Sequence, residues 1–343
     1  MLKDELRLLE SFQGLTVLVV GDIMVDQYTH GSVSRISPEA PVPIVRKESD
    51  RYALGGAANV AHNVASLGAK AILCGVVGND QRKDIVRAKA QAAHIAVDAV
   101  VVDESRQTTL KHRIVSGANH QLVRIDDESS EPLSVEIEDA VLSKVLPIIP
   151  TVNAVVFSDY VKGFFTSRVT KEILEAAQRS SIPVYADIKP ENRTKFVGVD
   201  LVTPNVKEAE ELTGLSDVRD MGKKISEFFR SDVVITRGSD GMSIFERNGR
   251  EVAIPSKKIS VFDVSGAGDT VIAVLSLARA AGADIITAAT CANAAGAVVV
   301  QKAGTAVLEM RELKEALGIK STGNEHESVS AGFDPTKIVE HRG

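Results

Sequence analysis

The 343-residue sequence has few cysteines and no excess of basic residues. Cys74 and Cys291 lie in apolar or alanine-rich surroundings without C-x-x-C spacing, so we expect buried free thiols rather than a disulfide or a zinc site. Reduced thiols indicate the cytoplasm. The formal net charge of −6 argues against a nucleic-acid or anionic-membrane surface, because such surfaces need clustered Lys and Arg.

The sequence also lacks a long uninterrupted hydrophobic run. Its longest apolar region, residues 271–300, is broken by Arg279, Gly282 and Asp284, which favours two packed helices over a membrane span. Residues 1–9 mix both charges in an amphipathic pattern and have no signal-peptide core. We therefore expect a short surface helix at the N-terminus and no transmembrane segment.

Familiar nucleotide-binding motifs are missing. The sequence contains no G-x-x-x-x-G-K-[ST] loop, no His-Arg-Asp kinase signature and no G-x-G-x-x-G after its first strand. Its seven histidines show no metal-ligand spacing. Any phosphate chemistry must therefore rely on another loop and on local cations.

A glycine-rich bend at residues 262–270 is the most informative stretch present. It runs into a helix whose apolar positions from Val271 onward follow helical spacing. Gly266 and Gly268, with Ala267 between them, allow an anion to approach the positively polarised helix N-terminus. Asp269 would repel that anion unless it faces a substrate hydroxyl, as the base in phosphoryl transfer does. An ordinary strand-to-helix turn is the alternative.

Short apolar runs alternate with helical patterns along most of the chain. The expected buried strands are residues 15–21, 71–77, 97–102, 154–157, 182–186 and 232–236. The expected helices are residues 60–67, 81–93, 135–146, 167–179, 271–278 and 285–300. This order predicts an α/β fold with a mostly parallel sheet flanked by helices.

Two β-prone segments interrupt this alternation. Residues 28–50 contain three interleaved prolines and cannot be helical, while residues 107–126 form a plausible hairpin. Together they predict a small lid sheet over the site. Lys111 and Arg113 would share one face of it because side chains alternate along a strand.

Polar residues follow several strand ends, where ligands gather in α/β sheets. Asp22 and Asp26 come after the first strand, although solvated loop acids are an equal alternative. Asn205 and Glu208 follow Pro204 at i, i+3 spacing, on one helix face where both could reach hydrated Mg²⁺ or merely cap the helix. The loop 236–241 is able to take a nucleotide phosphate or ribose.

Three motifs resemble the ribokinase-like (PfkB) sugar kinases. In chain order these are Gly55-Gly56 with Asn59, Pro204-Asn205-x-x-Glu208, and Asp263-x-x-Gly266-Ala267-Gly268-Asp269-Thr270. The likeness covers residues 13–318 and, through residues 20–26, 35–43, 158–163 and 201–205, is closest to the heptose 7-phosphate kinases of the family.

The resemblance implies a ribokinase-like three-layer kinase domain over residues 1–318 with a small β-sheet lid. Residues 319–343 are polar and aperiodic, and we expect a disordered tail. The implied activity is ATP-dependent phosphorylation of the anomeric hydroxyl of D-glycero-D-manno-heptose 7-phosphate, a step towards ADP-heptose for the lipopolysaccharide core. Another sugar or sugar-phosphate kinase, or a catalytically idle nucleotide- or sugar-binding protein, are the alternatives.

The family's motifs imply roles for individual residues. Asp269 would be the base, and the anion hole would consist of Gly266, Ala267 and Gly268. ATP, its Mg²⁺ and a monovalent cation such as K⁺ would be held by Asn205, Glu208, Thr236, Gly238, Gly241, Asn293, Asp263 and Ser265. The sugar would be held by Asp26, Gly55, Gly56 and Asn59, with Asp187 and Lys189 standing where relatives carry Asp-Pro-Lys.

A phosphorylated substrate needs dedicated cations in an acidic chain. The candidates, by strand order or lid position, are Lys111, Arg113, Arg124, Lys162 and Lys189, and the sequence leaves open which of them bind. The resemblance also implies a homodimer formed through the lid. A polar tail of this size cannot form a further domain, so we expect a separate nucleotidyltransferase.

Overall fold

A nine-stranded sheet forms the centre of the molecule in the computed structural model, which describes residues 2–117, 120–257 and 259–319. The strand order is β13-β12-β11-β10-β9-β8-β1-β4-β5, parallel except that β12 pairs antiparallel with both β11 and β13. The strands are β1 Thr16–Gly21, β4 Lys70–Val77, β5 Ala96–Val102, β8 Ala154–Ser158, β9 Val184–Asp187, β10 Leu201–Val202, β11 Asp232–Thr236, β12 Met242–Phe245 and β13 Glu251–Ile254. The predicted mostly parallel sheet is confirmed.

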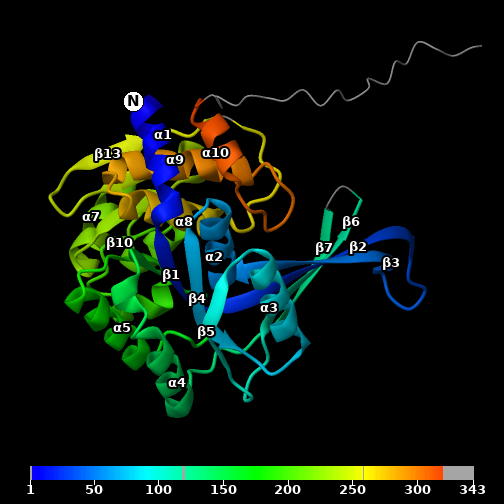
Figure 1. Cartoon of the computed structure of the whole chain (residues 1–343). Helices are drawn as coiled ribbons and strands as arrows, with labels where there is room; N and C mark the ends of the chain where they lie inside the picture. The colour runs from blue at the N-terminus through cyan, green and yellow to red at the C-terminus, as the bar shows by residue number, and fades with distance from the viewer. Residues whose placement is uncertain (1, 118–119, 258, 320–343) are drawn as a thin grey trace, which may run out of the picture.

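Helices cover both faces of this sheet (Figure 1). One hydrophobic core includes side chains of α2 Ala57–Ser66, α3 Gln81–Ala92, α8 Ala267–Ala280, α9 Ile285–Val299 and α10 Met310–Ala316. The other core includes side chains of α4 Val135–Val145, α5 Ser167–Arg179, α6 Val206–Thr213 and α7 Val218–Phe229. The N-terminal helix α1, Leu2–Ser11, also forms as predicted. The predicted tail lies outside the described residues except for Ile319.

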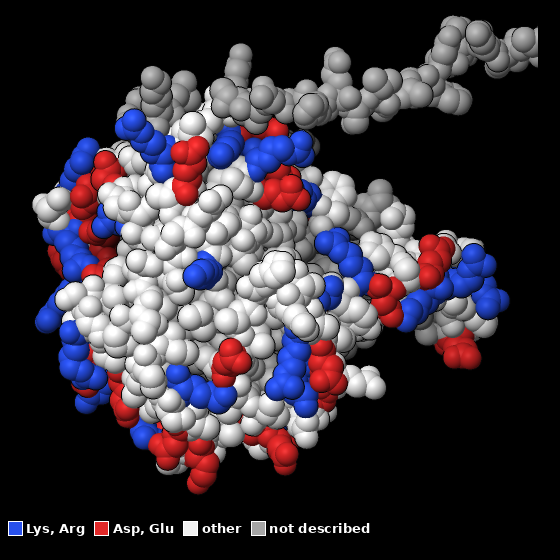
Figure 2. Space-filling view, viewed as in Figure 1, with Lys and Arg blue, Asp and Glu red and all other residues white. Residues whose placement is uncertain are grey.

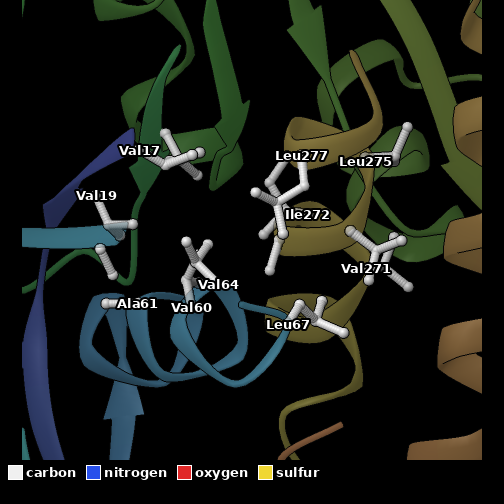
Figure 3. Packing of buried hydrophobic residues seen from close by; sticks show 14 of the residues in the cluster. Val17, Val19, Val60, Ala61, Val64, Leu67, Val271, Ile272, Leu275 and Leu277 are labelled. Atoms are coloured by element: carbon white, nitrogen blue, oxygen red, sulfur yellow. The ribbon is translucent and has the colours of Figure 1, made fainter. Parts of the chain in front are cut away.

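The packing of α2 against α8 and β1 fixes the position of the glycine-rich bend. Figure 3 shows apolar side chains of α2 and α8 meeting beside β1, among them Val64, Ile272 and Val19. Each is fully buried, and burying such a side chain stabilises the fold by about 1.5–3 kcal/mol. The first turns of the two helices are therefore held in a fixed relation to each other.

A separate four-stranded sheet projects from the body (Figure 1). Its order is β3-β2-β6-β7, with β2 Ile23–Ile36, β3 Pro43–Gly56, β6 Thr109–Ser116 and β7 His120–Asp127. We call it the lid sheet. The predicted segment 28–50 is too short, because β2 starts directly after β1 and β3 continues to Gly56. Pro38 and Pro41 fall in the turn, and Pro43 occupies the first position of β3, where proline is tolerated.

Surface charge is mixed on the face seen in Figure 2. Lys and Arg side chains alternate with Asp and Glu around a broad uncharged middle, and the projecting lid carries both signs. In the described part of the chain, no helix is long and apolar enough to cross a membrane. Both cysteines are buried and free, as predicted.

Candidate active site

Asp269 lies buried in the first turn of α8, where the glycine-rich bend ends. Its Oδ2 accepts a hydrogen bond from Asn59 Nδ2 at 2.7 Å, and its Oδ1 accepts one from the Tyr160 hydroxyl at 2.7 Å. Burial raises the pKa of Asp269 to about 6, even though both hydrogen bonds favour the carboxylate. A carboxyl group with such a pKa is suited to accept a proton near neutral pH.

Gly266 caps α8 in a left-handed conformation, with φ of 77°. A Cβ at this position would lie 2.7 Å from Asn59 Nδ2, so any other residue would displace the amide that holds Asp269. The predicted anion hole of Gly266, Ala267 and Gly268 thus forms the start of α8. Of its backbone N–H groups, that of Ala267 donates to the Val264 carbonyl at 3.2 Å.

A charged cluster at the ends of β9 and β10 lies next to the start of α8. Lys189 Nζ forms an ion pair with Glu208 and lies 4.0 Å from Asp187 Oδ1. Burial raises the pKa of Asp187 to about 7, although Lys189 favours its charged form. Burial lowers the pKa of Lys189, but Asp187 and Glu208 outweigh it and raise that pKa overall. Lys189 therefore remains a cation between two acids.

Asn205 and Glu208 form a capping box at the start of α6. Glu208 N donates to Asn205 Oδ1 at 3.0 Å, and Asn205 N donates to Glu208 Oε2 at 2.9 Å. The helix begins at Val206, so Asn205 is its N-cap rather than a residue on the helix face, which corrects the prediction. The capping alternative is present in the structure, and it places both side chains beside Lys189.

The lid contributes a second buried ion pair. Asp26 on β2 pairs with Arg113 on β6 and also accepts a hydrogen bond from the Thr305 hydroxyl at 2.9 Å. Thr305 and Tyr28 are hydrogen-bonded to each other. Gly55 pairs with Met24 across β2 and β3, and a Cβ on Gly55 would come within 2.6 Å of Asp26 Oδ2. These contacts join the lid to the loop after α9.

Four of the five candidate cations already have carboxylate partners. Besides Arg113 and Lys189, Lys162 pairs with Glu128 at 2.7 Å and Arg124 with Asp126 at 2.8 Å. Lys111 forms no ion pair within the described residues. Its Nζ lies 4.9 Å from the ring centroid of Tyr160. Burial lowers the pKa of Lys111, as do the nearby Arg113, Arg124 and Lys162, although the charge of Asp26 opposes them. Lys111 is thus a half-buried cation available to a ligand.

The residues predicted to contact nucleotide lie around the ends of β11 and β13. Thr236 N donates to the Pro204 carbonyl at 3.0 Å, which brings Thr236 next to Asn205. Gly238 begins the short helical turn that follows β11. Gly241 packs against the Ile254 carbonyl. Asn293 on α9 donates to the Pro255 carbonyl at 3.0 Å.

Asp263 closes the loop that precedes α8. Its Oδ1 accepts from Ser265 N at 2.8 Å and its Oδ2 accepts from Gly304 N at 2.9 Å. Asp263 and Ser265, the predicted monovalent-cation residues, are therefore neighbours. Within the described residues, no group of three or more His, Cys, Asp or Glu is placed to hold a metal ion.

Asp22 is a site candidate that the structure places in a supporting position. Its carboxylate accepts backbone hydrogen bonds from Tyr160, Lys162 and Phe164 at 2.7, 3.2 and 3.4 Å. These bonds shape the loop that presents the Tyr160 hydroxyl to Asp269. Asp22 is buried, which excludes the solvated loop acid of the two sequence alternatives.

Sequence reasoning missed two residues at this site. It did not single out Tyr160 as a partner of Asp269 or Thr305 as a partner of Asp26, since their separations along the chain are 109 and 279 residues. Tyr160 stands in the stretch 158–163 that carried the resemblance, which is the one signal that could have identified it.

The fold agrees with the comparisons to known proteins. The chain matches the pfkB family carbohydrate kinases over residues 15–311. The chain therefore belongs to this family, whose members are carbohydrate kinases, and it is an ATP-dependent sugar kinase. Among curated relatives, the Caulobacter vibrioides "Bifunctional protein HldE" is 43% identical over 310 residues, which cover 88% of this chain. The matched part is 63% of that relative's own length.

Solved structures support the fold. Arabidopsis thaliana ribokinase, solved with ribose and ATP, has a TM-score of 0.69 at 18% identity, covering 88% of this chain and 98% of that one. Escherichia coli phosphofructokinase-2, solved with potassium, has a TM-score of 0.72 at 18% identity, covering 89% and 98%. The predicted ribokinase-like fold with its small separate sheet is confirmed.

Proposed function

We propose that this chain transfers the γ-phosphoryl group of ATP to the anomeric hydroxyl of D-glycero-D-manno-heptose 7-phosphate. The resemblance to heptose 7-phosphate kinases supports the sugar, and the 43% identity to the HldE relative agrees with it. The observation that carries the proposal is Lys111, a half-buried lysine with no ion pair in the described residues, which lies over the Tyr160 ring beside the buried Asp269. A sugar kinase with a free cation at this position is suited to a phosphorylated sugar.

In this proposal the sugar lies between the lid and the start of α8. Asp26, Gly55, Gly56 and Asn59 bind its hydroxyls, and Asp269 accepts the proton of the hydroxyl that attacks the phosphorus. Asn59 and Tyr160 hold the two carboxylate oxygens in place, so the base needs no reorganisation during the reaction. The N–H groups at 266–268 stabilise the charge that develops on the transferred group.

The acids beside Lys189 suit a hydrated Mg²⁺ better than a directly coordinated one. Both oxygens of Glu208 already accept a hydrogen bond or ion pair, and Asn205 Oδ1 accepts from Glu208 N. Mg²⁺ commonly keeps several waters, and these oxygens retain lone pairs that can accept from such waters. When bound, the ion would neutralise charge on the ATP phosphates, with Thr236 and Gly238 next to the nucleotide.

Three further assignments belong to the same proposal. Asn293 lies near adenine, and Gly241 shapes the loop beside the nucleotide. Asp263 and Ser265 line a monovalent-cation site. Conversion of the product towards ADP-heptose by a separate nucleotidyltransferase also remains a prediction.

A substrate screen tests the proposed function. ADP release would be measured with heptose 7-phosphate, ribose, fructose 6-phosphate and fructose 1-phosphate at matched concentrations. The proposal requires the highest kcat/KM for heptose 7-phosphate and transfer to its C1 oxygen, assigned by phosphorus NMR. A higher kcat/KM for ribose or for a fructose phosphate would identify that sugar as the substrate instead. No turnover of any sugar would favour a catalytically idle binding protein.

The raised carboxyl pKa values predict a pH dependence. Activity needs Asp269 as carboxylate, and burial raises its pKa to about 6. kcat/KM should therefore rise as pH increases through about 6. Asp187, whose pKa burial raises to about 7, interacts with Asp269, so the measured pKa belongs to the pair. A profile of kcat/KM from acid to mildly basic pH checks this, and a flat profile across that range would exclude a titrating base.

We also propose that the lid forms a homodimer. Its strands and turn expose apolar side chains, namely Val33, Ile36, Val42, Val123 and Ile125. A twin lid would cover these side chains and the strand edges. Light scattering should give a dimer, and the double substitution Ile36→Lys with Ile125→Lys should give a monomer. Leu215→Lys, an exposed residue outside the lid, is the matched control, and a fully active parent monomer at micromolar concentration would refute lid pairing.

A further inference from the structure

A hollow borders the Asp269 site at Asn59 and Thr305. Its volume is about 400 Å³, and it is enclosed by α2, the end of α3, β3 and the loop after α9. Arg51, His62 and Lys89 line it, each from a different element. None of the described residues that line this hollow is acidic. We call it the rear pocket.

The positive charge of the rear pocket is not compensated by the chain. Arg51 and Lys89 form no ion pair in the described residues, and Arg51 donates only a long hydrogen bond, 3.5 Å, to the Ala303 carbonyl. Burial lowers the pKa of Lys89, and so does the charge of Arg51. Burial likewise lowers the pKa of His62, and so does Lys89. Basic groups brought together without an acid favour an anion between them.

The rear pocket is distinct from the Asp269 site but shares two wall residues with it, Asn59 and Thr305. Asn59 donates its side-chain amide to Asp269, and Thr305 donates its hydroxyl to Asp26. The polar ends of both side chains are thus engaged on the catalytic side. A ligand in the rear pocket would thus contact two residues that hold both carboxylates.

We propose that the rear pocket binds a small phosphate ester. Arg51 offers a planar fork of donors for the phosphate oxygens, and Lys89 adds a point charge. His62 supplies a third donor from α2. Ala92, Ala93 and Val307 line the remaining wall, where the carbon part of the ester makes apolar contact. The volume exceeds that of inorganic phosphate and accommodates a pentose or hexose phosphate.

NMR of the full chain tests this proposal at a single residue. The imidazole signals of His62, assigned with His62→Gln, are followed while inorganic phosphate or ribose 5-phosphate is added at constant ionic strength. Three variants are compared with the parent. Arg51→Gln/Lys89→Gln removes two positive charges from the rear pocket, and the control Lys83→Gln/Arg87→Gln removes two positive charges from α3 outside it. Lys111→Met removes the candidate phosphate-binding lysine of the Asp269 site. Circular dichroism confirms that each variant is folded.

The proposal predicts a saturable shift of His62 in the parent, with tighter binding of ribose 5-phosphate than of inorganic phosphate. The dissociation constant should rise at least about tenfold in Arg51→Gln/Lys89→Gln, since two charge-assisted contacts are lost. It should be unchanged in the control pair and in Lys111→Met. Absence of a His62 shift, equal weakening in the control pair, or loss of the shift in Lys111→Met would overturn the proposal. Equal affinity for both probes would show that the carbon part of the ester does not contact the apolar wall, which would overturn that part of the proposal.

Discussion

Replacing Asp269 with Asn is expected to lower kcat by roughly 10²–10⁴-fold, the usual contribution of a positioned general base. The sugar hydroxyl must lose its proton as the phosphoryl group arrives, and an amide cannot accept it. Asn59 and Tyr160 can still hydrogen-bond to an amide at this position, so the geometry is conserved. ATP affinity should change little, because Asp269 faces the sugar rather than the nucleotide.

Single-turnover kinetics and an ATP titration on the same variant measure the two effects separately. Asp284→Asn is the matched control, because Asp284 caps α9 away from the site and Asn also serves as an N-cap. If Asp269 only stabilises the start of α8, the substitution would cost about 0.3–1 kcal/mol of stability and leave turnover nearly normal. Turnover within a few-fold of the parent would therefore exclude Asp269 as the base.

Replacing Lys111 with Met is expected to raise KM for the phosphorylated sugar by about 10–100-fold, because a contact to a charged phosphate contributes roughly 1.5–3 kcal/mol. Met keeps an unbranched apolar stem against the Tyr160 ring, so the lid packing is conserved. KM for ATP and the melting temperature should stay near the parent values. Steady-state kinetics with each substrate varied in turn measures the difference.

Lys207→Met provides the control, because Lys207 is a lysine on α6 whose side chain is 84% exposed. Arg113→Ala and Lys189→Ala would be less informative variants. Each would leave a buried carboxylate without its partner and so disturb the site as a whole. Equal increases of KM for sugar and ATP in Lys111→Met would mean that this lysine does not act on the sugar phosphate alone. No change in either KM would mean that Lys111 contacts neither substrate.

The main features of the fold were predictable because they depend on local patterns. Apolar runs and helical spacing are properties of neighbouring residues, and they predicted the alternation that builds the sheet. The helix start at Gly266 was predictable for the same reason. The lengths of β2 and β3 were not predictable, because each strand extends only as far as it pairs with the other. The prolines in the turn between them also look, in the sequence, like the end of regular structure.

The sequence by itself determined the family, the parallel sheet, the lid and the position of Asp269 at a helix N-terminus. Only the tertiary structure decided which groups meet Asp269 and which of the five candidate cations has no ion pair among the described residues. Tyr160 reaches Asp269 because Asp22 holds its loop, whereas Arg113, Arg124 and Lys162, but not Lys111, pair with neighbouring acids there. Such contacts join residues far apart in the chain, so packing of the layers determines them rather than local sequence.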